Sequence, residues 1–127
     1  MPKILSIVER AYHGTLEEQD DPILWVTAAV KNAGGDLSLL LRSNAVNYAV
    51  LGQDASGLTI GGIHLKVPPT IDKDLEALMA KGVAVYAVEE DLAARGISKG
   101  GLIHGVQVIP WAGVAPLLDA HDSIWHW

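Results

Sequence analysis

The chain has 127 residues, a formal net charge of −6 and no cysteine. A domain of this length buries roughly two-thirds of its unfolded surface, which is enough for a hydrophobic core. The negative charge, without any Lys/Arg cluster interleaved with aromatic residues, disfavours direct binding to nucleic acid. The lack of cysteine excludes disulfides, thiolate metal sites and any nucleophilic or persulfide chemistry on a thiol of this chain.

Half of the residues are hydrophobic and only 19% are charged, so the surface has little polar material. This balance favours a protein whose apolar surface is partly covered by a partner subunit. A compact monomer with a large aliphatic sheet is the alternative. No apolar run is long enough to span a membrane, and Met1-Pro2-Lys3 leads into a strand without a signal-peptide pattern. We therefore expect a cytoplasmic protein that makes no membrane contact.

The N-terminal part of the chain predicts a strand, a loop and a helix. Lys3 to Val8 is a short apolar run, typical of a buried strand. Polar and acidic residues from Glu9 to Asp21 predict a loop over the carboxyl edge of the sheet. Asp20 or Asp21 can cap the following helix, which opens with Pro22.

That helix, Ile23 to Ala33, is apolar nearly all round, and Gly34-Gly35 ends it. A helix with so little polar surface is usually covered on two sides, by its own sheet and by something else. Asp36 to Leu41 then predicts the second strand. Ser43 or Asn44 is expected to cap a further helix that runs through Tyr48 to Leu51.

The segment from 52 to 69 has a less regular pattern. Gly61-Gly62, flanked by Leu58-Thr59-Ile60 and Ile63-His64-Leu65, is a two-residue turn signal that predicts a small hairpin. An extended loop without strands is the alternative. Thr70 or Asp72 is expected to open a helix with an apolar face, which Lys81-Gly82 closes. The residues on that face are Leu75, Leu78 and Met79.

The stretch from Val83 to Ile97 predicts a buried strand that runs directly into a two-turn helix. Glu89, Glu90 and Asp91 in the first turn oppose the helix dipole, and Gly96 can take the left-handed closing conformation. Because these carboxylates complete the helix start themselves, a second anion arriving there would be repelled. An anion-binding or persulfide site at this position is therefore disfavoured.

The C-terminal part predicts two more strands around a helix. Val106 to Ile109 is a core strand after a Gly-rich connection, and Ser123 to Trp127 is the last strand. Between them, Val114, Leu117 and Leu118 point inward from the last helix. Alternating strands and helices predict one α/β domain over residues 1–127, a three-layer α/β/α sandwich with a mainly parallel five-stranded sheet.

Common catalytic and metal-binding motifs are absent. There is no GxxxxGK[ST], no GxGxxG after the first strand, and no serine in a nucleophile elbow. The histidines lack HxxxH and HxH spacing, so we expect no metal site, even with Glu17 or Asp20 near His13. No cofactor is expected. The acidic run at residues 17–21 is interpreted as a solvated loop and helix start.

Four polar residues are candidates for a small-ligand pocket over the sheet edge. They are His13, Asn44, Glu89 and His104, because His13 and His104 lie in loops that could approach each other there. A second candidate site is aromatic. Trp111, Trp125 and Trp127 are costly to leave in water and are typical of an interface, with packing of the tail on its own core as the alternative.

Several of these segments resemble the DsrE/DsrF/DsrH superfamily of small sulfur-relay proteins, which includes the TusB, TusC and TusD subunits. The similarity is sharpest in Val85 to Ile97, which is similar to the YAxxEDLxARG segment of the DsrH/TusB branch. The tryptophan-containing last strand also resembles that branch. Further similarity lies in Lys3 to Val8, the Gly-Gly-Asp-Leu strand entry, Ala45-Val46 and Lys81-Gly82-Val83.

The resemblance implies a DsrE-like α/β/α fold and assembly into trimers or hexamers, with DsrE-like subunits as partners. It also implies that Val88 occupies the position where DsrE/TusD members carry a persulfide cysteine. The implied role is a non-carrier subunit of a sulfur-relay complex, a scaffold or docking partner without catalytic activity, which a sulfur-carrier protein could also contact. The N-terminal half is more DsrE-like, which leaves a homo-oligomer open. A homo-oligomeric small-ligand-binding protein or cofactor-free enzyme is the alternative function.

Overall fold

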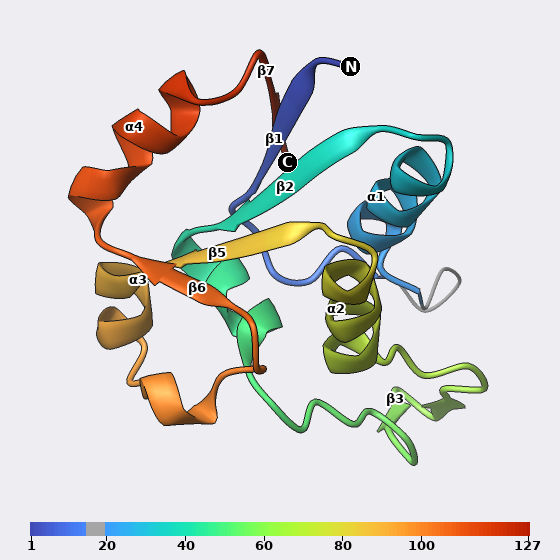
Figure 1. The fold of residues 1–127 in the computed structure, drawn as a ribbon. Coiled ribbons are helices and arrows are strands. Elements are labelled where there is room, and N and C mark those ends of the chain that lie inside the picture. The colour runs from blue at the N-terminus through green and yellow to red at the C-terminus, as the bar shows by residue number, and fades with distance from the viewer. Residues whose placement is uncertain (15–19) are drawn as a thin grey trace.

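A computed structural model describes residues 1–14 and 20–127. In this part of the chain, five strands form one sheet in the order β6-β5-β2-β1-β7, and every pairing is parallel (Figure 1). The α/β fold with a five-stranded parallel sheet is therefore confirmed. The strands are β1 (Lys3–Val8), β2 (Asp36–Leu41), β5 (Ala84–Val88), β6 (Gln107–Ile109) and β7 (Ser123–His126).

Alternate residues of the strands point to two separate cores, as the two-residue period of a strand requires. In β2, Leu39 and Leu41 belong to the larger core and Leu40 to the smaller one, and all three are fully buried. The larger core packs against α1 (Pro22–Asn32), α2 (Ile71–Ala80) and the 3₁₀ helix η1 (Ser43–Ala49). The smaller core packs against α4 (Val114–Asp119), so helices cover both faces of the sheet (Figure 1).

Helix α1 begins where the sequence predicts it. Of the two candidate caps, Asp21 is the one used, since its Oδ1 accepts hydrogen bonds from the backbone N–H groups of Ile23 at 3.0 Å and Leu24 at 3.1 Å. The helix buries Ile23 and Leu24 on one side, but Trp25 is 67% exposed. The second covered side that the apolar pattern predicts is thus open to solvent in the isolated chain.

The helix expected to run through Tyr48 to Leu51 forms, but as a 3₁₀ helix that ends at Ala49, and its predicted cap is wrong. The segment forms η1, and neither Ser43 nor Asn44 supplies a cap, because the N-cap position is Arg42 and has no side-chain hydrogen bond. Ser43 instead adopts a left-handed conformation with φ 52°. The partners that hold Ser43 and Asn44 come from a helix almost fifty residues further along the chain, as described below.

The hairpin is confirmed: β3 (Thr59–Ile60) pairs antiparallel with β4 (Ile63–His64). Gly61 and Gly62 both have positive φ, 56° and 79°, which the tight turn between the strands requires. Ile60 and Ile63 are half exposed on this hairpin. In Figure 1 it lies away from the main sheet, beyond α2.

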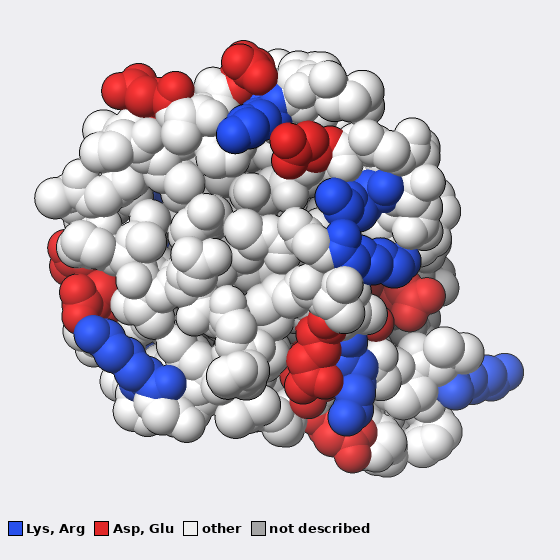
Figure 2. Space-filling model, viewed as in Figure 1, with Lys and Arg blue, Asp and Glu red and all other residues white. Residues whose placement is uncertain are grey.

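The remaining helices are short. They are α3 (Glu89–Ala94) and the 3₁₀ helices η2 (Lys99–Gly101) and η3 (Trp111–Gly113). None of the helices in the described ranges is long and apolar enough to cross a membrane. Figure 2 shows a face on which charged side chains lie mainly at the periphery, around a broad area without them.

Candidate functional site

The carboxyl edge of the sheet is held together by the three carboxylates that open α3. The N-cap residue, Val88, supplies no side-chain cap, and the carboxylates are hydrogen-bonded to other segments. Asp91 Oδ2 accepts a hydrogen bond of 2.8 Å from the backbone N–H of Ser43, which opens η1. Glu90 accepts hydrogen bonds of 2.8 and 3.0 Å from the backbone N–H of Trp111, which opens η3. Each acid thus fixes a different loop.

Glu89 and Arg95 complete this arrangement from the two ends of α3. Glu89 forms an ion pair with Lys99 of η2. Arg95 donates hydrogen bonds of 2.8 and 3.1 Å to the Asn44 side-chain carbonyl and one of 3.2 Å to the Asp91 backbone carbonyl. The acids were expected to complete the helix start by themselves. They instead link α3 to η1, η2 and η3, and each carries a partner.

Val88, at the position that the family resemblance assigns to a cysteine, is fully buried. It lies in the smaller core with Leu5, Ile7, Leu40 and Val114. A side chain at this position therefore faces packed aliphatic groups, and reagents in solvent have no direct access to it.

The structure does not gather the four residues predicted to line a ligand pocket. Asn44 and Glu89 are held by Arg95 and Lys99, and the backbone N–H of His13 donates to the Tyr48 hydroxyl at 3.2 Å. His104 is exposed and precedes β6. Because β6 is parallel to β5, residues before it lie at the amino edge of the sheet, not at the carboxyl edge. Ligand binding by these residues stays a prediction.

The tryptophans predicted to form an interface lie at the carboxyl edge or on the last strand. Trp111 is 49% exposed and stacks with the Arg42 guanidinium, whose Cζ is 4.7 Å from the ring centroid. Trp127 is 41% exposed, and its indole N–H donates to Ser6 Oγ at 2.8 Å. Trp125 is half-buried, paired with Ser6 across β1 and β7. Their role as an interface stays a prediction.

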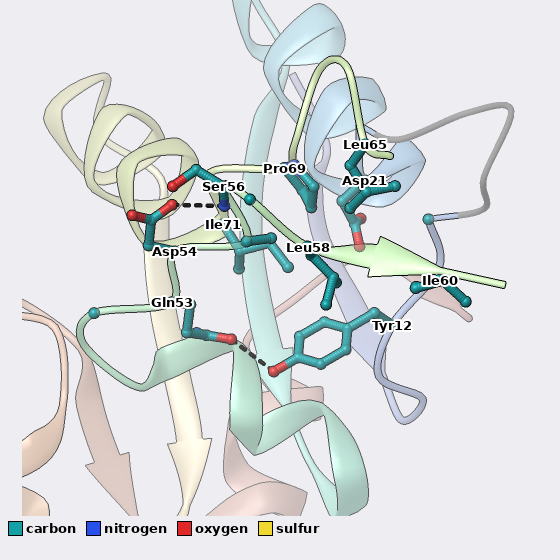
Figure 3. A pocket seen from close by; sticks show the side chains of 14 residues that line it. Tyr12, Asp21, Gln53, Asp54, Ser56, Leu58, Ile60, Leu65, Pro69 and Ile71 are labelled. Atoms are coloured by element: carbon teal, nitrogen blue, oxygen red, sulfur yellow. Dashed lines mark hydrogen bonds between the residues drawn. The ribbon is translucent and has the colours of Figure 1, made fainter. Parts of the chain in front are cut away.

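A cavity that sequence reasoning missed lies between the β1–α1 connection and the segment that carries the hairpin. Its volume is about 800 Å³. Figure 3 shows Tyr12 and Gln53 on one side, joined by a 2.6 Å hydrogen bond from the Tyr12 hydroxyl to the Gln53 carbonyl oxygen. Gln53 also donates to the backbone carbonyls of Tyr48 and Val50. The cavity is bounded by residues far apart in the chain, and the Gly61-Gly62 hairpin signal was the available clue to its far wall.

Asp21 connects this cavity to the core. It lines the cavity, is only 2% exposed, and accepts a hydrogen bond from the Tyr48 hydroxyl in addition to the two from α1. Tyr48 is fully buried and stacks on Tyr12 with ring centroids 5.2 Å apart. Burial, the hydrogen bond to Asp21 and the Asp21 charge raise the pKa of the Tyr48 phenol above its ordinary value. The phenol is therefore a proton donor to Asp21, not a base.

No group of three or more metal-ligating side chains is found in the residues that the structure describes. The expected roles of Glu17 and of the rest of the loop at 15–19 lie outside the described residues.

The fold described above is that of a DsrE-like α/β protein, and comparison with known families makes this specific. The family described as "DsrH like protein" matches residues 58–124, more than half of the chain. The chain belongs to this DsrH-like family, which confirms the resemblance to the sulfur-relay superfamily that the sequence suggested.

Solved structures share the fold over the whole chain. The ychN protein from E. coli is 25% identical, covers 100% of both chains and has a TM-score of 0.71. Protein MTH1491 from Methanobacterium thermoautotrophicum is 18% identical, with 98% of this chain and 99% of that chain covered and a TM-score of 0.64. Protein BT1422 from Bacteroides thetaiotaomicron is 12% identical, with 99% and 95% covered and a TM-score of 0.67. No curated protein matches the sequence.

The Asp91 contact is expected to stabilise the carboxyl edge. Replacing Asp91 by Ala leaves the backbone N–H of Ser43 without its acceptor and removes a carboxylate beside Arg95. We expect Asp91→Ala to lower the free energy of unfolding by about 1–3 kcal/mol. Urea unfolding measures this. Asp119→Ala, at an exposed position of α4, is the matched control and should change stability by less than about 0.5 kcal/mol. Equal stabilities of the two variants would contradict the proposed linkage.

The raised pKa of Tyr48 predicts a loss of stability at alkaline pH. Tyrosines in an unfolded chain ionise near pH ~10, whereas burial keeps folded Tyr48 protonated above that pH. Its contribution is fully present below pH ~10 and declines as pH rises further, by up to about 1.4 kcal/mol per pH unit. Urea unfolding from about pH 8 to about pH 11 should show a shallower decline for Tyr48→Phe than for the wild type. Tyr86→Phe, which leaves the Asp21 pair intact, should keep the wild-type slope; an identical decline in all three proteins would refute the assignment.

Proposed function

We propose that this chain is a subunit of a sulfur-relay assembly that carries no sulfur itself and acts as a scaffold or docking partner for DsrE-like subunits. The observation that carries the proposal is the residue found at position 88, where the family resemblance places a cysteine. Val88 stands there, fully buried, and the chain contains no thiol anywhere. Membership of the DsrH-like family supports the relation to sulfur relay. Sulfane sulfur in such an assembly is then carried by a partner in the cytoplasm.

The helix start beside Val88 also does not suit an anion. A persulfide or thiolate is stabilised by unpaired N–H groups and by positive charge at a helix N-terminus. Here three carboxylates occupy the first turn, and they are engaged with Ser43, Lys99 and Trp111. Negative charge and a closed set of contacts therefore oppose sulfur chemistry at this position and favour a structural role for α3.

A docking role requires an exposed surface that is rigid, and the carboxyl edge offers one. Contacts run along it without a break: Trp111 stacks on Arg42, Arg42 pairs with Glu9 at 3.2 Å, and Glu9 pairs with His126 at 3.1 Å. Trp127 continues the line, since its carbonyl accepts from the Glu9 backbone N–H. We name these five residues the carboxyl-edge patch. Tryptophan and arginine together are the residue types most enriched where binding energy concentrates.

The docking role predicts that the patch tryptophans carry association energy. We expect Trp111→Ala and Trp127→Ala each to weaken assembly, with itself or with a cysteine-bearing DsrE-like subunit, by about 2 kcal/mol or roughly thirtyfold in Kd. Light scattering and native mass spectrometry measure the assembly, and isothermal titration measures the Kd. Ile63→Ala removes an apolar side chain of similar exposure on the hairpin, outside the patch, and serves as the control.

Ile63→Ala should leave both the mass and the Kd unchanged. A protein that stays a monomer alone and with every DsrE-like partner, or an assembly that tolerates both patch substitutions, would exclude docking through this surface. Half-buried Trp125, which the sequence also suggested for the interface, should have a smaller effect in this assay.

The buried state of position 88 predicts that a cysteine there does not restore sulfur transfer. We expect Val88→Cys to react with an aromatic disulfide reagent roughly tenfold more slowly than Ala93→Cys, because the thiol at the end of β5 is enclosed by the smaller core and the thiol on the following helix α3 is exposed. The chain's own lack of cysteine makes each signal unambiguous. Rapid labelling of Val88→Cys, followed by persulfide formation from a sulfur donor, would show that the site accepts sulfur after all.

A further inference from the structure

The cavity beside Tyr12 has the size and lining of a small-molecule site. Its volume of about 800 Å³ falls in the range of ligand pockets, roughly 300–1,000 Å³. Apolar side chains form much of the wall, from the hairpin segment and the start of α2: Leu58, Ile60, Leu65, Pro69 and Ile71. Figure 3 shows Leu58 and Ile60 on the same side as the Tyr12 ring, so a flat apolar group could lie between them.

Among the described residues that line this cavity, the charged groups are all of one sign. They are Asp21 and Asp54, and no described lining residue is Lys, Arg or His. The ion pairs formed among the described residues involve neither of these two aspartates. The backbone N–H of Ser56 donates to Asp54 at 2.8 Å and lowers the pKa of that carboxyl, so Asp54 stays ionised at neutral pH.

The same negative field extends to the start of α2. Burial, followed by the charge of Asp20, raises the pKa of the Asp74 carboxyl, and Asp21 and Asp72 act in the same direction. These aspartates, at the cavity and at the start of α2, would repel an anionic ligand. A bare metal ion would find mostly aliphatic walls, and no cluster of three or more ligating side chains occurs among the described residues.

We propose that this cavity binds a small organic molecule that combines a protonated amine with an apolar, preferably aromatic, body. The amine is attracted by Asp21 and Asp54, and the body packs against the Leu58 and Ile60 side. The Tyr12 ring adds a cation–π surface, since it lines the cavity and stays half exposed while Tyr48 holds it by stacking. This site is separate from the carboxyl-edge patch and does not depend on the proposed docking role.

Three indole probes of matched shape test the charge requirement: tryptamine, tryptophol and indole-3-acetate. Isothermal titration and ligand-observed NMR measure binding to the full chain. We expect tryptamine to bind at least about tenfold more tightly than neutral tryptophol, and indole-3-acetate to bind most weakly. Added salt should reduce the difference between tryptamine and tryptophol, because it screens the aspartates. Equal affinity for the three probes, or no binding of tryptamine at millimolar concentration, would overturn the proposal.

Two variants locate the probe. Asp54→Asn should weaken tryptamine several-fold and leave tryptophol unchanged, whereas Leu58→Trp, at a position 45% exposed, should fill the cavity and weaken both. Asp119→Asn on α4 removes the same charge far from the cavity and should change neither affinity. Asp21 is unsuitable for this test because it caps α1. Thermal melting confirms that each variant is folded. Tryptamine binding that survives both Asp54→Asn and Leu58→Trp would place it outside this cavity and refute the proposal.

Discussion

The structure depends on how the carboxylates of α3 are used. In a parallel sheet every segment that follows a strand emerges at the same edge, and here η1, α3 and η3 follow β2, β5 and β6 directly. A chain without disulfides must fix these loops by packing and hydrogen bonds. Glu89, Glu90 and Asp91 do so by binding η2, η3 and η1, so one short helix orders the edge. Each carboxylate is thereby engaged with a partner. Together they place negative charge at the N-terminus of α3, where the helix dipole would otherwise attract an anion.

This use of α3 makes the stretch with the sharpest family resemblance unsuited to a reactive thiol at position 88. A reactive cysteine needs partial exposure and a positive environment. Position 88 has neither, because the strand ends in the smaller core and the helix opens with acids. Val88 is well placed for packing against Leu5, Leu40 and Val114, and its burial joins β5 to α4 across the sheet. The chain therefore retains the fold of the family, and the packing at the junction of β5 with α3 stabilises this fold.

Local signals predicted the fold because they are decided within a few residues. The apolar runs of β1 and β2, the Asp21 cap and the Gly61-Gly62 turn each depend on near neighbours. Ser43 failed as a cap because its partner, Asp91, is 48 residues away in the chain and no local pattern reveals it. His104 was placed at the wrong edge because a Gly-rich connection gives no direction of its own. The cavity was missed for the same reason, since its walls come from separate segments between Tyr12 and Ile71.

Asp21 shows how one residue can serve both the core and a binding surface. Three hydrogen bonds, two from α1 and one from Tyr48, hold its carboxylate in a fixed position with almost no solvent exposure. These donors satisfy the oxygens, yet no cation in the described chain forms an ion pair with the charge. A positive group entering the cavity would therefore gain attraction without any rearrangement of the fold, because the carboxylate is already ordered. Preorganisation of this kind comes from the helix cap itself, which places a buried negative charge at the wall of a cavity that is otherwise largely apolar.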